Sequence, residues 1–261
     1  MHFRPIAFLL FLLMTSCELK EDAELVMPVS PAKLFVEGYL MPGEPIRLSL
    51  IRTSSFQEDL SLQLVWNARV ELMLPDTAIQ LQNIFYKDKK SGKLINYASP
   101  YRLPAVLPGD SVRLRIITEN STDTLYAATE PVEQIKITGW TLSDTQIRWS
   151  FANGSEAKDR FYGVYLEYKL AGQTIRKSEY YDHSLSSEPE LSMRLNVPNG
   201  NRPYRITLYR ITPANYHFQR ALQQASRSNI DPFEPPVMLP SNVQGGQGIF
   251  TYSTQDTLVI E

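Results

Sequence analysis

Most of the chain is patterned as short β-strands. In segments 46–52 and 66–74, apolar and polar residues alternate with a period of two, as expected when one face of a strand is buried. Tyr and Phe are frequent and β-branched residues recur in short runs, which also favours strands. On these grounds we predict strands at 33–40, 46–52, 66–74, 112–117, 123–129, 135–140, 146–151, 161–170, 173–181, 191–197, 204–211 and 258–260.

Turn residues separate the predicted strands at short intervals, and the pattern places no helix between them up to residue 131. The Pro-Gly turns at 42–45 and 108–111 are examples. This arrangement is typical of an immunoglobulin-like sandwich or a close relative. Glu130-Pro131 marks a plausible boundary, so we predict an Ig-like β-sandwich domain at 32–131 and a second, β-rich domain at 132–261.

The second predicted domain also contains a helix near 213–226. Pro213 suits the first position of a helix. Four residues recur there at helical spacing and should face the sheet: Phe218, Ala221, Leu222 and Ala225. One face of the strand 161–170 should carry Tyr162, Val164, Leu166 and Tyr168. The chain is therefore predicted to be mainly β, with an N-terminal Ig-like β-sandwich followed by a second β domain that carries one packed C-terminal helix.

The N-terminal segment has a different pattern. Arg4 precedes the apolar run 6–14, and small residues then lead to Cys17, which is the only cysteine. This is the pattern of a secretory signal peptide, residues 1–16, that ends in a lipobox-like site with Met14 where Leu is usual. A transmembrane helix needs about 20 apolar residues, and this run is shorter. We predict that Cys17 carries lipid; a plain cleaved signal and a core cysteine are the alternatives.

Residues 17–31 are predicted to form a lipidated tether. Within it, Lys20 is followed by the acidic residues Glu21 and Asp22, which resembles the export signal that Bacteroidetes lipoproteins use to reach the cell surface. A solvated linker is the simpler interpretation, because any lipoprotein needs one. Two or more acyl chains give stable anchoring. We therefore expect an outer-membrane, lipid-anchored protein on the cell surface, with the periplasmic face as the alternative.

The charge balance argues against a nucleic-acid partner. The 261 residues include 26 basic and 28 acidic side chains, which gives a net charge of −2. Removal of Arg4 with the signal peptide leaves 25 against 28, or −3. Such a chain has no basic excess to contact phosphates. With Cys17 lipidated, it also has no thiol for a disulfide, so its stability has to come from a hydrophobic core.

No motif identifies a reaction. His183 and His217 are isolated, with no His-x-x-x-His or Glu-x-x-His pattern, and Gly-x-Ser-x-Gly is absent. Spacing does not reveal the paired carboxylates of a glycosidase, because only the fold brings them together. We predict no catalytic residues, no metal and no cofactor, with an enzyme as the alternative.

Two C-terminal motifs invite functional interpretations. Gly245-Gly246-Gln247-Gly248 resembles a phosphate loop but lacks the Gly-Lys-Ser/Thr ending. We interpret these glycines as letting the backbone turn back under the preceding helix. The segment 231–236 is expected to cap the helix region with Phe233 plugged into the core, and partner binding is its alternative role.

The tryptophans also have two interpretations. Trp140 and Trp149 flank a predicted turn, so we expect a cross-strand core pair. Together with Trp66 they would otherwise form a platform on which a sugar stacks.

Several segments together resemble a known family: Leu34–Gly38, Arg47–Phe56, Ala68–Leu72, Asp231–Pro235 and Ser241–Phe250. They look like the Bacteroidetes lipoprotein family called domain of unknown function 4249, over nearly the whole mature chain. The C-terminal block is the specific part, although Gln247 replaces the Leu that is common in the family. We assign structural roles to its motif residues, which are Asp231, Pro232, Phe233, Pro235, Ser241, Asn242, Gly245, Gly246, Gly248 and Phe250.

The resemblance implies a location and a context rather than a chemistry. Family members are similar in setting to accessory lipoproteins of TonB-dependent outer-membrane transporters. We therefore expect a non-enzymatic accessory or ligand-binding partner of such a β-barrel transporter, with an unidentified small-molecule or glycan ligand. The alternatives are a surface hydrolase or glycan-processing enzyme, and a structural or adhesive surface module.

Overall fold

The computed structural model describes residues 32–54, 63–89, 91–104, 111–119, 124–143, 146–170, 172–196, 203–228, 230–231 and 233–260. All of them belong to one compact unit, Pro31–Glu261. The predicted signal peptide, the tether, Cys17, Lys20, Glu21 and Asp22 lie outside the described residues, as does Pro232.

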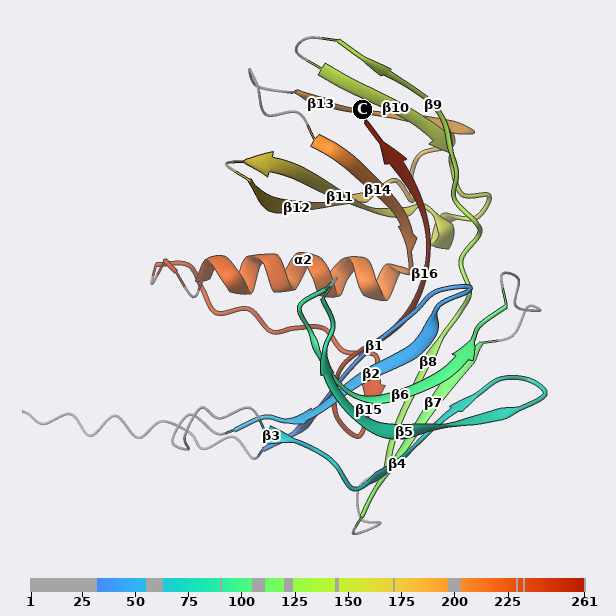
Figure 1. The fold of residues 1–261 in the computed structure, drawn as a ribbon, viewed down its shortest axis with the longest axis vertical. Helices are drawn as coiled ribbons and strands as arrows, with labels where there is room; N and C mark the ends of the chain where they lie inside the picture. Colours follow the sequence, from blue (N-terminus) through green and yellow to red (C-terminus); the bar gives the residue numbers. More distant parts are fainter. Residues whose placement is uncertain are drawn as a thin grey trace, which may run out of the picture. The chain divides into compact units, whose positions relative to one another are not determined.

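The described part of the chain is mainly β, with one α-helix near its C-terminal end, which confirms the predicted fold class (Figure 1). The elements of the first half are β1 (Leu34–Leu40), β2 (Pro45–Arg52), β3 (Gln63–Leu64), β4 (Ala68–Met73), β5 (Ala78–Lys87), β6 (Leu94–Arg102), β7 (Val112–Thr118) and β8 (Thr124–Thr129). They are followed by β9 (Ile137–Leu142), β10 (Gln146–Ala152), the 3₁₀ turn η1 (Ala157–Asp159), β11 (Phe161–Leu170), β12 (Gln173–Asp182), β13 (Glu190–Asn196), β14 (Pro203–Ile211), α2 (Pro213–Ser228), β15 (Val243–Gln244) and β16 (Gln247–Val259).

Strand β16 connects the two halves of the large sheet. The order in that sheet is β12-β11-β14-β16-β1-β2-β6-β5-β4-β7-β8-β15, and β13-β10-β9 form a second sheet. The first part of β16 pairs in parallel with β1, and its last seven residues pair antiparallel with β14. Figure 1 shows this strand running from the lower group of strands to the upper one. The sequence predicted only a short last strand at 258–260, whereas the structure has one of 13 residues that begins within the Gly-rich motif.

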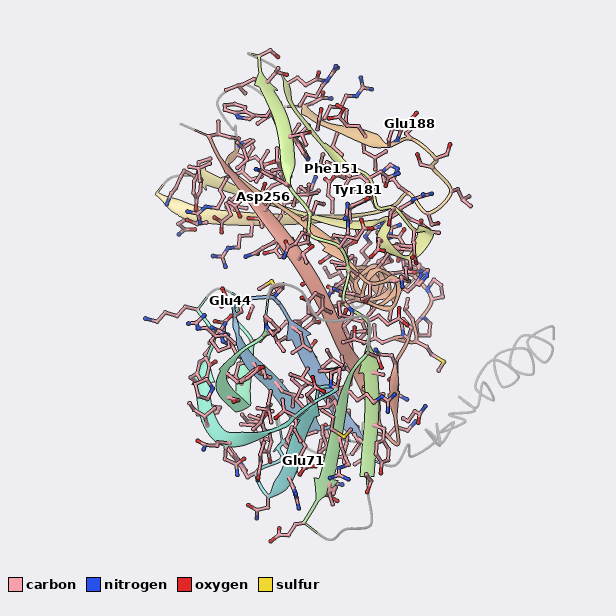
Figure 2. All side chains as sticks on the ribbon, turned by 90° about the vertical axis from the view of Figure 1, so that its right-hand side faces the viewer. Glu44, Glu71, Phe151, Tyr181, Glu188 and Asp256 are labelled. Carbon is pink, nitrogen blue, oxygen red and sulfur yellow. The ribbon has the colours of Figure 1, made fainter. Side chains whose placement is uncertain are left out.

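Among the described residues, two large hydrophobic cores and a smaller cluster of Phe161, Tyr180 and Ile211 lie along this sheet. The first packs residues such as Val36, Leu50 and Val70, all fully buried, and it includes Phe250 and Tyr252 of β16. The second lies between the three-stranded sheet and β11 and β14, and it includes Phe151, which Figure 2 labels. The Phe151 ring lies 4.9 Å from the Tyr162 ring. Because β16 contributes to both, the division at residue 131 stays a prediction.

The predicted apolar face of β11 is confirmed. Tyr162, Val164 and Leu166 are buried in the second core, and Tyr168 packs against it. Strands β5 and β6 were not predicted. Ile79 and Leu81 alternate with Gln80 and Gln82, but the alternation stops at Asn83, where β5 becomes exposed on both faces and its pairing with β6 shifts register. Four residues of alternation are too few to mark the ten-residue strand.

Helix α2 packs with more than one face. Phe218 is buried as predicted, with its ring 6.4 Å from the ring of Phe35 on β1. Leu222, however, is exposed, so the prediction is wrong for this residue. The polar side chains of Gln219 and Gln223 reach the sheet instead, where Gln223 donates to the Ser178 carbonyl at 3.1 Å. The apolar residues at helical spacing therefore predicted only part of the surface with which α2 packs against the sheet.

Candidate functional site

An open pocket of about 290 Å³ lies where β15 joins β8 at the end of the large sheet. We call it the β15 pocket. It is lined by Met73 of β4, Arg113 and Leu114 of β7, Tyr126, Ala127 and Ala128 of β8, Asn242, and Gln244 of β15.

Strand register places the side chains that line this pocket. Residues directly opposite one another on neighbouring antiparallel strands share a face of the sheet. Met73 lies opposite Arg113, which lies opposite Ala128. Two residues along, Glu71 lies opposite Arg115, which lies opposite Tyr126. The outward positions of the alternating strands thus form two neighbouring rows, and the pocket lies beside both.

The Glu71 row holds a tight charge cluster. Arg69 Nε donates to Glu71 Oε1 at 2.6 Å, and Arg115 Nε donates to Glu71 Oε2 at 2.9 Å. The hydrogen bond from Arg115 is the main reason that the pKa of Glu71 lies below its usual value of 4.5. Both arginines are therefore already paired with a carboxylate that stays ionised.

Arg113 differs from these two arginines. Its side chain is exposed and forms no ion pair with any residue that the structure describes; its Nε has only a long, 3.5 Å contact to Ser111 Oγ. The neighbouring Tyr126 is 46% exposed. A guanidinium group beside an aromatic ring can hold a carboxylate or phosphate group next to an apolar or cyclic part of a ligand.

Asn242 connects the wall of this pocket to β16. Its Nδ2 donates to the Phe250 carbonyl at 2.7 Å and to the Ala128 carbonyl at 3.3 Å, while its Oδ1 accepts from the Phe250 amide at 2.9 Å. Ser241 Oγ accepts from the Val243 amide at 3.1 Å, which turns the chain into β15. These motif residues build the pocket's edge.

The glycines of the motif allow a close backbone approach. Gly245 and Gly248 have φ angles of 79° and 119°, which disfavour other residues. A Cβ on Gly248 would lie 1.9 Å from the Val36 carbonyl oxygen, and one on Gly246 would lie 2.8 Å from that of Leu34. The motif thus packs against β1 and β8, because the first residues of β16 pair with β1. Gln247 pairs with Phe35, whose ring contacts Phe218 of α2, so the motif also lies near the helix.

The segment after α2 ends the helix but does not enter the core. The Asp231 amide donates to the Arg227 carbonyl at 2.9 Å, and Ser228 Oγ donates to the Pro235 carbonyl at 2.9 Å. The prediction that Phe233 is buried is wrong, since its side chain is 94% exposed. Its amide donates to Asp231 Oδ1 at 3.0 Å, and this Asx turn closes the backbone locally while the ring points outward.

His183 and His217 both act on the Asp182 carboxylate. Asp182 has a lowered pKa, chiefly because of its hydrogen bonds with Ser184, and both His183 and His217 contribute to the effect. The sequence predicts isolated histidines because neither belongs to a His-x-x-x-His or Glu-x-x-His pattern. Among the described residues, no three His, Cys, Asp or Glu side chains gather closely enough to hold a metal ion.

The tryptophan prediction is confirmed in part. Trp149 lies opposite Trp140 across β10 and β9. Trp149 is buried, but Trp140 is 45% exposed because β9 is an edge strand. Trp66 precedes β4 and contacts Phe85 of β5, with the ring centroids 5.7 Å apart. It therefore packs apart from the other two.

The family model described as "Domain of unknown function (DUF4249)" matches residues 20–258. The chain belongs to this family. No curated protein matches it. The match spans the pocket, the Gly-rich motif and the segment after α2 of this DUF4249 protein. In the described part of the chain, no helix combines the length and the apolar character needed to span a membrane.

Arg113 and Tyr126 belong to no motif that marks them as candidate site residues in the sequence. The alternation in β7 places Arg113 and Arg115 on the same outward face, and that signal is visible in the sequence. It does not show which arginine meets a carboxylate, because Glu71 comes from a strand more than 40 residues earlier.

Proposed function

We propose that this DUF4249 protein is a Bacteroidetes lipoprotein, anchored in the outer membrane by lipid on Cys17 and displayed on the cell surface. It acts there as a non-enzymatic accessory of a TonB-dependent transporter and binds a ligand of that system. The signal-like segment 1–16 and the acidic residues after Lys20 support the location. The family's setting supports the transporter.

Arg113 carries the ligand-binding part of the proposal. It is a cation without an ion-pair partner among the described residues, at a pocket whose neighbouring arginine is fully engaged. Together with Tyr126 it selects a small ligand that has an anionic group beside an apolar or cyclic part. A fragment of an acidic glycan and a small organic acid both have this chemistry.

The partner is tested by purifying the intact lipoprotein from its own outer membrane in mild detergent and identifying co-purified proteins by mass spectrometry. A β-barrel transporter is expected in stoichiometric amounts. A lipoprotein that purifies alone would contradict the accessory role and shift attention to the enzymatic and adhesive alternatives.

The pocket is tested with Arg113→Gln, measured by calorimetry against a panel of small organic acids and acidic oligosaccharides. Loss of a charge-assisted hydrogen bond of about 1.5–3 kcal/mol should weaken binding by about tenfold or more. Arg194→Gln is the matched control, because Arg194 is also an exposed strand arginine without a described ion pair. Equal weakening by both variants, or by neither, would contradict the assignment of the pocket.

A further inference from the structure

The segment after α2 exposes an unusual set of apolar side chains. Ile230, Phe233 and Met238 are 85%, 94% and 92% exposed, and they lie within nine residues of one another. Single exposed apolar residues are normal, but a group of large ones in contact with water marks a surface that binds something. We call these three residues the apolar tip.

The backbone around the apolar tip is held in place. The Ile230 and Asp231 amides both donate to the Arg227 carbonyl, at 2.8 and 2.9 Å, and the Glu234 amide donates to the Asp231 carbonyl at 3.1 Å. These bonds, with the Asx turn at Asp231, restrain the backbone that carries Phe233. The ring of Phe233 itself is exposed.

The apolar tip lies within reach of the predicted membrane anchor. Fourteen residues separate Cys17 from Ala32, and 15 peptide steps span up to roughly 50 Å when extended. The ring of Phe35, near the start of β1, contacts Phe218, and α2 then rises about 1.5 Å per residue, or about 18 Å, to Ile230. In Figure 1 the start of β1 and the segment after α2 lie toward the same, left-hand side.

We infer that the apolar tip inserts into the bilayer that holds the lipid on Cys17, as a second membrane contact. The inference rests on the proposed lipid anchoring. Large apolar and aromatic side chains enter the boundary between headgroups and acyl chains favourably. The exposed Arg227 in the last turn of α2 is placed to meet lipid phosphates, and the Asp231 carboxylate accepts a hydrogen bond from the Phe233 amide. Two contacts fix the orientation of the protein on the membrane, which a single anchor does not do.

Depth-dependent fluorescence quenching tests this inference. The mature lipoprotein carries one introduced cysteine, Phe233→Cys, labelled with a fluorophore, and is reconstituted into phosphatidylethanolamine and phosphatidylglycerol vesicles. Some vesicles contain lipids with brominated acyl chains, which quench only a label that enters the bilayer. Phe233 is almost fully exposed, so its replacement leaves the fold intact.

Leu185→Cys is the matched control. Leu185 is 99% exposed and follows His183, whose amide bonds to Arg160 beside Phe161. The Phe161 ring lies 6.2 Å from the ring of His217, in the first turns of α2. The control label therefore lies near the start of the helix, whereas the apolar tip follows its end. The label at 233 is expected to lose most of its fluorescence in brominated vesicles, and the label at 185 to keep it.

Equal quenching at both positions, or none at 233, would overturn the inference. Protection of the 233 label that appears only when a transporter barrel is present in the vesicles would also overturn it, because the apolar tip would then bind protein. The intact mass of the same sample reports the lipid on Cys17. If the lipid is absent, both the proposed anchoring and the inference are wrong. If the lipid is present but the label at 233 is not quenched, only the inference is wrong.

Discussion

Two glutamates in the large sheet are held in the same way, but their surroundings differ. Glu71 is bound by Arg69 and Arg115, and Glu167 on β11 is bound by Arg176 and Arg205 from the strands on either side. Burial, the largest single influence, raises the pKa of Glu167, but Arg176, Tyr204 and Arg205 together lower it below its usual value. Each carboxylate is nearly buried and stays ionised.

The row of residues next to each glutamate makes the difference. Beside Glu167, Tyr165 bonds to the Tyr180 hydroxyl at 2.9 Å, and Tyr180 donates to Gln219 of α2 at 3.2 Å. Burial under the helix raises the pKa of Tyr180 far above its usual value. Beside Glu71, the row of Met73 and Arg113 is left open and forms the β15 pocket. A glutamate held by two arginines thus lies beside a face that α2 covers in one half of the sheet and beside an open face in the other half. Of these two faces, only the open one has room for a ligand.

The largest effect is expected from Gly248→Ala, which disturbs the strand on which both faces depend. The new Cβ would lie 1.9 Å from the Val36 carbonyl oxygen at a φ of 119°. Strain and overpacking should together lower the free energy of unfolding by about 4 kcal/mol, measured by urea titration. Gly92→Ala is the control, because Gly92 also has a positive φ but has nothing within 4 Å. The free energy of unfolding of Gly92→Ala should fall by about 1 kcal/mol. Similar decreases in the two variants would contradict the close approach of β16 to β1.

A smaller loss of stability is expected from a substitution on the covered face, and almost none from one on the open face. Phe218→Ala removes the buried ring that seats α2 against β1, and should lower the free energy of unfolding by about 3 kcal/mol. Leu222→Ala on the same helix and Tyr126→Ala on the open face should each change it by about 0.5 kcal/mol, because both side chains are exposed. A large loss for Leu222→Ala would mean that the helix packs with the face that the sequence predicted.

The smallest effect concerns the two glutamates. Glu71→Gln and Glu167→Gln should each lower the free energy of unfolding by about 1 kcal/mol at pH 7, since their arginine partners are partly exposed. Because folding lowers the pKa of each carboxyl, its contribution is present above the usual value of 4.5 and is lost as pH falls through the folded value. Urea titrations between pH 7 and pH 3 should therefore show each variant approaching the wild-type stability on acidification.

Glu44→Gln is the control for this pair. Glu44 makes a long, exposed ion pair with Arg47 and lies away from Glu71 in Figure 2. Its replacement should change stability by only about 0.3 kcal/mol at any pH. If Glu44→Gln lowers the free energy of unfolding as much as the other two variants and with the same pH dependence, surface charge in general, rather than the two arginine clusters, sets the acid sensitivity.

The local sequence pattern predicted some of these elements and not others. The alternation in β7 and the apolar face of β11 were visible in the sequence, because each strand is half-buried and its side chains point to opposite faces in turn. Strand β5 and the first part of β16 were not, since the alternation in β5 stops at Asn83 and β16 begins in a Gly-rich turn. The apolar stripe on α2 failed at Leu222 because the helix contacts the sheet through polar side chains as well.

The sequence by itself determined the mainly β fold, most strands, the C-terminal helix and family membership, because strand and helix periodicity and the family motifs are local properties of the chain. Only the tertiary structure decided that β16 spans both halves of the sheet and that Arg113 is left without the carboxylate that engages Arg115. These outcomes depend on which distant strands become neighbours and in which register. Strand register is set by long-range burial, and no short segment encodes it alone.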